Sequence, residues 1–595
     1  MKGSSNTVST KYSDELIRWL IDLGYTHCFF VAGGNIMHLL DSARKNLTCI
    51  PVVHEVAAGI AAEYFNEIST SEKAFALVTA GPGITNLVTS VAGAWLEHRD
   101  LLVIGGQVKS SDLMSGSLRQ RGIQEIDGVS IVSSICKAAF TLKSQVSETE
   151  FKSKVELGTS GRKGPVFIEV CLDVQGAVPE NDLVELADHE KSLMTQNVST
   201  LQVELIRKLM SKAQRPVWLI GAGVSRSTAT ECRDLLERLD FPLITTWHGA
   251  DRLSARSENY FGRMDTWGQR AANLIACQAD LLVVFGARLG LQETGFNWQG
   301  FATNAEIIQI EIDEAELGKG HPRIDTPIHG DANNILKSLL QNQFEDRSAW
   351  MEYCKKIKHL LPLNETTNQT NKGYVSPYEF YLDASSFSDS DDVWVPASSG
   401  GANSVAIQAL QQWGDQKVVC DNGLASMGYG LSGAIGASFA APNQRVWLVE
   451  GDGGFSQNLQ ELATVAVNSL NVKIFIFSNN GYGSIRTTQR NYFDGAYLGC
   501  DTETGLGFPD WHILANAYGI PSTRFPEAGF NDANFASLLA NKGPLLVVVP
   551  IDPEQTYWPK ITSFVTASGG MASNPIHHMS PDLPISVQKQ VGAYL

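Results

Sequence analysis

Residues 445–483 decide the fold, and they read RVWLVEGDGGFSQNLQELATVAVNSLNVKIFIFSNNGYG. An apolar strand at 445–449 runs into GDGG, a helical stretch follows over 456–467, and a second apolar strand at 472–478 ends in NNGYG. This order predicts one βαβ crossover, which brings the carboxyl ends of two adjacent parallel strands together. Asp452 and Asn479 should therefore lie close together at the edge where open α/β sheets bind ligands.

The oxygen donors at this edge suit a hard cation. The Asp452 carboxylate, the Asn479 amide oxygen and a backbone carbonyl are ligands that Mg²⁺ accepts together with phosphate oxygens. The glycines around them let backbone N–H groups approach a phosphate at a helix N-terminus. Because an Asp-Gly pair alone marks many ordinary turns, the prediction depends on the complete pattern between two strands.

The same alternation of short apolar strands and helices occurs three times, which predicts an α/β fold of three doubly wound parallel-sheet domains. The expected strands lie near 26–33, 49–55, 74–83, 101–108, 164–170, 215–225, 241–247, 279–289, 305–313, 417–423, 445–449, 472–478 and 543–552. The expected domains are 11–180, 200–342 and 374–560, followed by an irregular tail at 561–595. Polar stretches at 180–199 and 363–372 would join the domains.

Composition limits the class of protein. Asp and Glu outnumber Lys and Arg by 63 to 46, for a net charge of −17. This balance argues against nucleic acid or an anionic membrane as a partner, because both need clustered positive charge. The nine cysteines form no CxxC pair, which favours reduced thiols in a cytoplasmic protein. Since no apolar leader and no run of about 18 apolar residues occurs, we expect neither secretion nor a membrane span.

The GDGG and NNGYG motifs together resemble the cofactor motif of thiamine-diphosphate (ThDP) enzymes, and the order of segments resembles their acetohydroxyacid synthase-like branch. The resemblance covers residues 11–555 and implies a pyrimidine-binding, a central and a diphosphate-binding domain. It implies that Asp452, Asn479 and the carbonyl of Gly481 hold Mg²⁺. The other residues that it assigns to ThDP binding in the diphosphate domain are Gly400, Gly401, Ala402, Asn403, Gly451, Gly453, Gly454, Tyr482 and Gly483.

Two further residues match family positions around the reactive part of ThDP. Glu55, at a strand end, matches the glutamate that hydrogen-bonds the aminopyrimidine ring and promotes loss of the thiazolium C2 proton. A carboxylate in a first helical turn can also simply favour the helix dipole, but the diphosphate motif favours the catalytic role. Met427 matches the apolar residue that wedges under the bent cofactor, although methionine also fills gaps in cores.

The resemblance also assigns two residues to the substrate side. Gly34 belongs to a turn in which Ala32 replaces the family proline, and residues 80–86, AGPGITN, resemble the substrate-side loop. Gln124 matches a glutamine that faces the reacting carbonyl. Ile123 stands where many synthases carry Phe, so the shape of the pocket would differ.

The central segment resembles the FAD-binding domain of the family. The residues at flavin positions are Gly221, Gly223, Gly286, Arg288 and Asp313. Many relatives keep a flavin that has no redox task, and others have lost it. A GxG after a strand is also an ordinary structural turn, so FAD binding stays open at this point.

Two departures from the family concern the acceptor. Synthases that join two keto acids carry a second Arg in a GxRxxxR pattern, and here Arg288 is followed by Gln292 at that place. A neutral amide cannot form the bidentate, charge-assisted pair that Arg forms with a carboxylate. The specificity Trp of the family aligns with Thr488. Both changes favour an acceptor ketone or aldehyde without a carboxylate at that position.

The resemblance therefore implies a ThDP- and Mg²⁺-dependent carboligase that decarboxylates a 2-keto acid, pyruvate above all, and adds the acyl unit to a carbonyl acceptor. The stretches 119–125, 262–273 and 480–486 resemble a branched-sugar, yersiniose-type subgroup whose acceptor is a nucleotide-activated keto-sugar. The alternatives are an acetolactate synthase, a decarboxylase or oxidase, a C–C hydrolase, and a non-catalytic ThDP-binding regulatory protein. The family also implies a homodimer or homotetramer with active sites at the interface.

Overall fold

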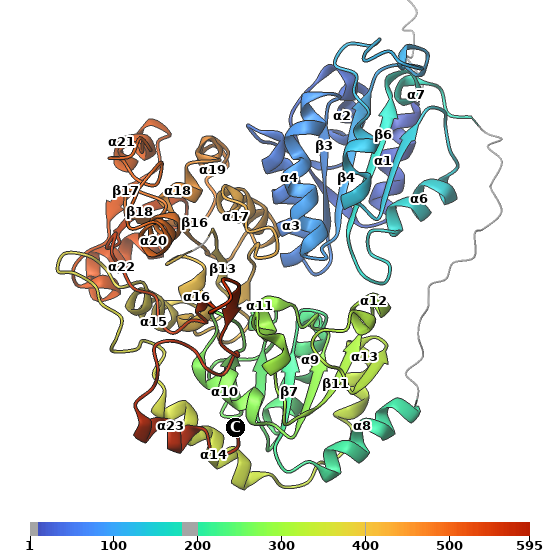
Figure 1. The fold of residues 1–595 in the computed structure, drawn as a ribbon. Coiled ribbons are helices and arrows are strands. Elements are labelled where there is room, and N and C mark those ends of the chain that lie inside the picture. The colour runs from blue at the N-terminus through green and yellow to red at the C-terminus, as the bar shows by residue number, and fades with distance from the viewer. Residues whose placement is uncertain (1–9, 181–199, 399) are drawn as a thin grey trace, which may run out of the picture.

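The computed structural model describes residues 10–180, 200–398 and 400–595. It contains three six-stranded sheets flanked by helices (Figure 1), in which every strand pairs in parallel with its neighbours. The predicted α/β class with three parallel-sheet domains is therefore confirmed. Beyond Glu180, the predicted join at 180–199 lies outside the described residues. Within the described ranges, no helix combines the length and the apolar character needed to cross a bilayer.

The first sheet has the strand order β2-β1-β3-β4-β6-β5. Its strands are β1 (Tyr25–Phe30), β2 (Thr48–Pro51), β3 (Lys73–Val78), β4 (Leu101–Gln107), β5 (Ala138–Leu142) and β6 (Pro165–Cys171). Its helices are α1 (Tyr12–Asp22), α2 (Met37–Ala43), α3 (Glu55–Ile68), α4 (Pro82–Leu96), α5 (Gly128–Val132), α6 (Glu148–Glu156) and α7 (Leu172–Gly176). Every residue of the central strands β4 and β6 is buried, as expected for strands covered on both faces.

The central sheet has the order β12-β11-β10-β7-β8-β9. Its strands are β7 (Pro216–Ile220), β8 (Leu243–Thr245), β9 (Tyr260–Arg263), β10 (Leu281–Phe285), β11 (Glu306–Glu311) and β12 (Thr326–His329). Its helices are α8 (Thr200–Lys212), α9 (Arg226–Glu237), α10 (Arg270–Gln278), α11 (Leu291–Thr294), α12 (Glu314–Gly318), α13 (Ala332–Leu339) and α14 (Ser348–Leu360). Figure 1 shows this domain in green beneath the other two.

The third sheet has the order β14-β13-β15-β16-β18-β17. Its strands are β13 (Val393–Pro396), β14 (Lys417–Val418), β15 (Val446–Gly451), β16 (Val472–Ser478), β17 (Ser522–Arg524) and β18 (Leu545–Pro550). Its helices are α15 (Pro377–Phe387), α16 (Ser404–Ala409), α17 (Tyr429–Ala440), α18 (Asp452–Phe455), α19 (Leu462–Val467), α20 (Gly483–Tyr492), α21 (Trp511–Ala517) and α22 (Ala533–Ala540). The predicted crossover between β15 and β16 is confirmed, since these strands are direct neighbours.

Two predictions about local structure are wrong. The single helix expected over 456–467 is broken: α18 begins at Asp452, a 3₁₀ turn covers Leu459–Glu461, and α19 follows. The tail expected to be irregular at 561–595 contains β19 (Ser563–Val565), β20 (Met571–Ser573) and α23 (Ile585–Val591). The reason is tertiary packing, because Val591 of α23 enters the apolar core of the central domain near α14 (Figure 1).

The first and third domains share one apolar core, which is formed around the crossing of α3 and α17. Small residues allow this close approach. A Cβ added to Gly433 would lie 2.6 Å from the Tyr64 ring, and one added to Gly436 would lie closer than 3.0 Å to the Ala61 carbonyl oxygen. The glycines of α17 are therefore required by packing between the two domains.

We expect Gly436→Ala to lower the free energy of unfolding by about 1–3 kcal/mol, because the new methyl group meets backbone that cannot move aside. The gain in helix propensity, about 1 kcal/mol, offsets part of this loss. Gly318→Ala in α12 is the matched control, since its Cβ would meet no atom within 4 Å. Denaturant unfolding measures both, and equal stability of the two variants would contradict the packing argument.

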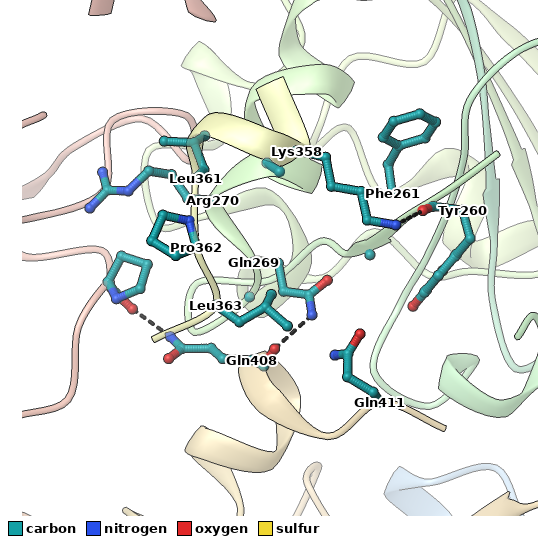
Figure 2. A pocket seen from close by; sticks show the side chains of 14 residues that line it. Tyr260, Phe261, Gln269, Arg270, Lys358, Leu361, Pro362, Leu363, Gln408 and Gln411 are labelled. Atoms are coloured by element: carbon teal, nitrogen blue, oxygen red, sulfur yellow. Dashed lines mark hydrogen bonds between the residues drawn. The ribbon is translucent and has the colours of Figure 1, made fainter. Parts of the chain in front are cut away.

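A cavity of about 170 Å³ lies between the central domain, the start of the linker after α14 and the third domain (Figure 2). Its walls are joined by hydrogen bonds from Gln269 to the Gln408 carbonyl, 2.6 Å, and from Lys358 to the Tyr260 carbonyl, 2.7 Å. None of the predicted cofactor or catalytic residues lines it. The cavity is therefore separate from the predicted cofactor site at the strand ends.

Candidate active site

The two residues predicted to bind Mg²⁺ lie at the carboxyl ends of the paired strands β15 and β16, where the Asn479 N–H contacts the Asp452 carboxylate. Asp452 is only 1% exposed, and burial raises the pKa of its carboxyl to about 6. The N–H groups of Asn480 and Asn479 oppose this rise by donating to Oδ2 at 2.7 and 3.0 Å. No Lys, Arg or His of the described chain is seen paired with this carboxylate. A buried carboxylate without a cationic side chain suits a bound cation.

The NNGYG loop folds back over Asp452. Asn480 has a φ of 57°, in the left-handed region, and the Asn479 amide oxygen accepts from the Gly481 N–H at 3.2 Å. The Tyr482 N–H donates to the Cys500 carbonyl at 2.7 Å, which fixes the end of the loop. Among the described residues no cluster of three His, Cys, Asp or Glu side chains could hold a metal. The oxygens of Asp452, Asn479 and Gly481 are a donor set that fits Mg²⁺.

The glycines of GDGG differ in their reasons for lacking a side chain. A Cβ on Gly453 would strike the Tyr482 ring, and one on Gly454 would strike the Ser398 hydroxyl. Gly451 has no atom within 4 Å of its Cβ position, so its backbone is open to a ligand. A Cβ on Gly483 would lie 2.9 Å from the Asn479 amide nitrogen. Packing thus explains Gly453 and Gly454 of GDGG and Gly483 of the NNGYG loop, whereas Gly451 leaves open backbone.

The second predicted diphosphate loop, Gly400 to Asn403, lies against the start of α20. Gly400 has a φ of 62°, and its Cβ position is 3.6 Å from the Ser484 hydroxyl. Gly401 packs against Tyr557, and Ala402 is buried. The loop and the NNGYG turn therefore line the same end of the third sheet.

The central domain holds α16, the helix that follows this loop. Trp247 donates to the Asn403 side-chain oxygen at 3.2 Å. Arg263 is fully buried and donates from Nε to the Ile407 carbonyl at 2.6 Å. Because one end of α16 carries the predicted diphosphate loop, the central domain fixes the position of that loop.

Glu55 begins α3 at the end of β2, and its side chain is 9% exposed. Asn86 donates to Glu55 Oε2 at 2.9 Å, which orients the carboxylate. The N–H groups of Val53 and His54 donate to Glu461 Oε1 at 3.1 and 2.9 Å. Glu461 follows the GDGG turn, so the third domain directly holds the segment that carries Glu55.

Met427 lies just before α17 and is 38% exposed. Its sulfur lies 3.7 Å from the Gln457 amide nitrogen, and the next residue, Gly428, adopts a φ of 84°. The helices α3 and α17 pack antiparallel, since Tyr429 at the start of α17 contacts Glu63 and Tyr64 near the end of α3. Within one chain Met427 therefore lies toward the far end of α3 from Glu55. The resemblance expects the two residues of one cofactor site to come from different chains.

The predicted substrate-side residues lie at the carboxyl ends of the first sheet. Gly34 begins a 3₁₀ turn after β1, is exposed, and has no atom within 4 Å of its Cβ position. Gln124 is exposed with a φ of 60°, and its carbonyl packs on Gly81. The buried Glu125 accepts from the Arg121 and Gly122 N–H groups, both at 2.8 Å, and closes this loop.

The residues at flavin positions are engaged with the protein itself. A Cβ on Gly223 would lie 2.7 Å from Gly286 Cα, and one on Gly221 would strike the Gly286 carbonyl. Asp313 Oδ1 caps α12 through the Ala315 N–H at 2.9 Å. Packing of two loops accounts for these glycines without a flavin, and Arg288 is partly exposed beside them. FAD binding stays a prediction.

The two departures from the family lie in different surroundings. The Gln292 side-chain oxygen accepts from the Asn422 amide at 2.9 Å, and Asn422 belongs to the loop that carries Met427. Thr488 is exposed on α20 and donates to the Ser484 carbonyl at 3.0 Å. Gln292 therefore connects the central domain to the predicted cofactor site.

Comparison with known families fits this geometry. Residues 10–131 match the N-terminal thiamine pyrophosphate binding domain, 203–339 the central domain and 399–549 the C-terminal thiamine pyrophosphate binding domain of thiamine pyrophosphate enzymes. The chain belongs to the thiamine pyrophosphate enzyme family, and it is a ThDP-dependent enzyme.

Its relatives include the acetolactate synthase large subunit of Cyanidium caldarium, which is 30% identical over 94% of this chain and 96% of its own length. A probable acetolactate synthase large subunit of Methanocaldococcus jannaschii is 30% identical over 92% of each chain. Acetolactate synthase isozyme 2 large subunit of Escherichia coli is 29% identical over 90% of this chain and 95% of its own length.

Sequence reasoning missed the residues that join the domains at the site, namely Glu461, Glu97 and His248. Each is a polar residue in a segment without a motif, and its partner lies far away along the chain. The only local signal was at Asn86, which ends the AGPGITN loop and orients Glu55.

Proposed function

We propose that the protein decarboxylates a 2-keto acid, with pyruvate as the first candidate, and transfers the acyl unit to a carbonyl acceptor, for which a nucleotide-activated keto-sugar is the leading choice. Membership of the ThDP family supports decarboxylation and acyl transfer. The cofactor stabilises negative charge on the acyl carbon of the donor, so that this carbon can attack a carbonyl. The neutral Gln292, which contacts Asn422 in the loop before Met427, supports an acceptor without a carboxylate.

In this proposal Glu55 holds and returns a proton at the ring nitrogen of the aminopyrimidine. Asn86 occupies Oε2, which leaves Oε1 to meet that nitrogen. Burial in the first turn of α3 excludes water from the carboxylate and strengthens the hydrogen bond. Met427 would support the bound cofactor as an apolar wedge, and ThDP would supply the carbon acid that loses its proton.

Asp452, Asn479 and the Gly481 carbonyl would hold Mg²⁺, and the metal would neutralise the diphosphate. Open backbone at Gly451 and the loop from Gly400 would donate N–H groups to phosphate oxygens. A protein of net charge −17 would thus bind an anionic cofactor through a metal and backbone dipoles rather than through a basic patch.

Acetolactate synthesis is the second candidate, because the relatives named above are acetolactate synthases. That reaction uses a keto acid as acceptor, whose carboxylate would need a cation. Gln292 supplies none, and its side-chain oxygen already accepts from Asn422. The neutral amide therefore favours an acceptor without a carboxylate.

Product analysis separates the candidates. We expect pyruvate alone to yield little acetolactate, and pyruvate with a keto-sugar nucleotide to yield a branched acetyl-sugar. Gln292→Arg should raise acetolactate formation roughly ten- to a hundred-fold, because a charge-assisted pair with the acceptor carboxylate is gained. Gln292→Glu, which introduces the opposite charge, is the control and should not increase acetolactate formation. Rapid acetolactate formation by the unchanged protein would overturn the choice of acceptor.

The homodimer or homotetramer stays a prediction, as does a cytoplasmic location. Within the single chain, α3 already packs on α17. A non-catalytic ThDP-binding protein is disfavoured because both Glu55 and its orienting Asn86 are retained. If the protein consumes no 2-keto acid with any acceptor, the proposal that a 2-keto acid is the acyl donor is refuted.

A further inference from the structure

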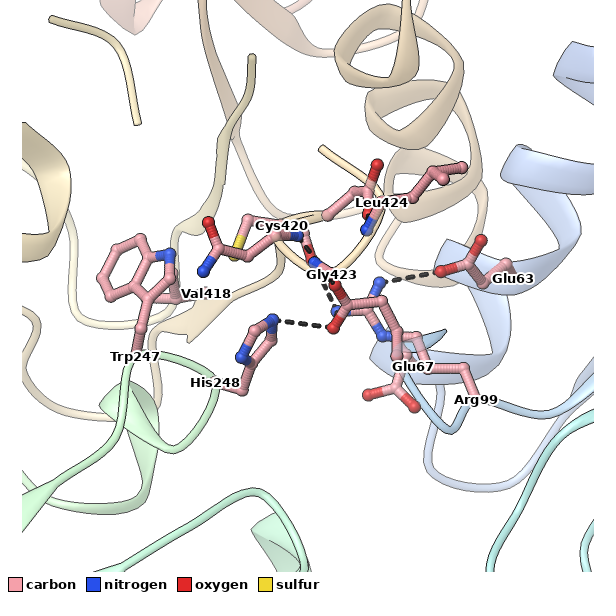
Figure 3. A network of polar contacts seen from close by, with 12 residues as sticks. Glu63, Glu67, Arg99, Trp247, His248, Val418, Cys420, Gly423 and Leu424 are labelled. Carbon is pink, nitrogen blue, oxygen red and sulfur yellow. Dashed lines mark hydrogen bonds and ion pairs between the residues drawn. The ribbon is translucent and has the colours of Figure 1, made fainter. Parts of the chain in front are cut away.

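A buried carboxylate, Glu97 of the first domain, contacts both other domains. It belongs to the polar network that Figure 3 shows around His248, Arg99 and Gly423. Its side chain is 3% exposed, follows α4 of the first domain, and pairs through Oε2 with His248 Nε2 of the central domain at 2.7 Å. Its Oε1 accepts from the backbone N–H of Asn422 at 2.7 Å and from that of Gly423, both in the third domain. One side chain therefore binds two other domains at once.

The segment that Glu97 binds is residues 420–428, which we call the Met427 loop. Asp421 shapes it by accepting from the Leu424 and Ser426 N–H groups at 3.2 and 2.9 Å. Ala425 has a φ of 53°, so the turn before Met427 is left-handed. Such a turn persists only where neighbouring contacts hold it.

The two ends of the Met427 loop are both tied to the first domain. Arg99 donates to the Cys420 carbonyl at 2.6 Å and to Glu63 at 2.8 Å. At the other end, the Tyr429 hydroxyl donates to Glu63 at 2.9 Å. Glu97 binds the residues between these ties, closest to the turn that aims Met427.

Glu97 and His248 form a charged pair. Burial opposes it, but the Glu97 carboxylate raises the pKa of His248 well above its usual value, and His248 in turn lowers the pKa of Glu97. A protonated His248 leaves the carboxylate oxygens as acceptors only, so Oε1 remains directed at Asn422 and Gly423.

We propose that Glu97 is a positioning residue that sets the place of Met427 against ThDP through the N–H groups of Asn422 and Gly423. Through His248, the central domain takes part in the same task. The inference rests on the proposed function, in which Met427 supports the cofactor. It assigns a role in catalysis to a residue that has no contact with the reacting atoms.

A double-mutant cycle tests this inference. The readout is the rate of deuterium exchange at C2 of ThDP, measured by quench and NMR on protein with saturating ThDP and Mg²⁺. We expect Glu97→Ala to slow exchange about ten- to a hundred-fold in protein that is folded and loaded, because small displacements of a positioning group have effects of this size. In Met427→Ala protein, adding Glu97→Ala should slow exchange no further.

Two more variants separate positioning from stability. Glu97→Gln keeps an acceptor oxygen at the same distance and should exchange within about threefold of the unchanged protein. Glu97→Asp keeps the charge but moves the carboxylate oxygens away from the loop, so its C2 exchange should be slower than that of Glu97→Gln. If Glu97→Ala does not fold, Glu97→Asp replaces it in the test. Glu365→Ala removes another buried pair, with Arg270 at 2.7 Å, outside the Met427 loop, and should leave exchange unchanged.

Two results would overturn the inference: an unchanged exchange rate in Glu97→Ala, or losses that multiply in the double variant. An unchanged rate in Met427→Ala would overturn the inference together with the assignment of Met427 in the proposed function. These outcomes are distinct, because the exchange assay needs neither the keto-acid donor nor the acceptor.

Discussion

Glu55→Gln should slow deuterium exchange at C2 of bound ThDP by roughly 10²- to 10⁴-fold, the range in which proton transfer by a placed side chain contributes. The amide cannot hold and return a proton at the aminopyrimidine nitrogen. It does preserve the volume of the carboxylate and the partner of Asn86, so α3 should begin at the same residue. ThDP should therefore still bind, since the residues proposed to hold its diphosphate are untouched.

The measurement pairs exchange, followed by NMR after an acid quench, with ThDP affinity from tryptophan fluorescence. Glu67→Gln is the matched control: it lies on the same helix, pairs with Arg226 at 3.3 Å, and should exchange at the normal rate. Wild-type exchange in a Glu55→Gln protein saturated with cofactor would remove Glu55 from the catalytic role.

The parts of the fold that could be predicted are those in which apolar runs encode burial on both faces. β4, β10 and β16 are examples, since nearly all of their residues are buried. The edge strands β2 and β14 were predicted, but other edge strands, β12 and β17 among them, escaped prediction because they lack this signal. β12 and β17 are short and half-exposed, so their pairing is decided by the neighbouring strand and not by their own residues.

The meeting of the two residues predicted to bind Mg²⁺ was predictable because it depends on local connectivity. Asp452 and Asn479 end two strands joined by one crossover, so their meeting follows from chain connectivity. Glu55 needed the family resemblance, since the sequence alone equally allows a residue that favours the helix dipole.

The contacts between domains could not be predicted. Glu461 meets His54 and Glu97 meets Asn422 across more than 300 residues of chain, and no periodicity or motif marks either pair. The glycines at the flavin positions show the opposite case. Their motif is clear in the sequence, yet contact between Gly223 and Gly286 accounts for it.

Asp452→Asn should lower the Mg²⁺-dependent affinity for ThDP by at least about 100-fold, because loss of an outer-sphere partner alone costs 10- to 100-fold at metal sites. The neutral amide of the variant removes the negative charge that the proposed Mg²⁺ site offers to a hard cation. The loss should not come from unfolding. Burial raises the pKa of the Asp452 carboxyl from its ordinary value to about 6 in the folded protein without metal. The folded protein therefore binds more protons at this carboxyl than the unfolded chain does. Its stability falls as the pH rises from the ordinary pKa of the carboxyl to about 6.

At pH 7 the ionised Asp452 therefore destabilises the metal-free protein, and Asp452→Asn should leave its midpoint of thermal unfolding unchanged or higher. Asp532→Asn is the control within the same domain. Asp532 also accepts from two backbone N–H groups, those of Asn534 and Phe535, both at 2.9 Å, but at the start of α22. Calorimetric titration of ThDP at fixed Mg²⁺ should show normal affinity in the control and weak binding in Asp452→Asn. Equal ThDP affinities of the two variants would mean that the cation is held elsewhere, because loss of a charged ligand lowers the affinity of a metal site.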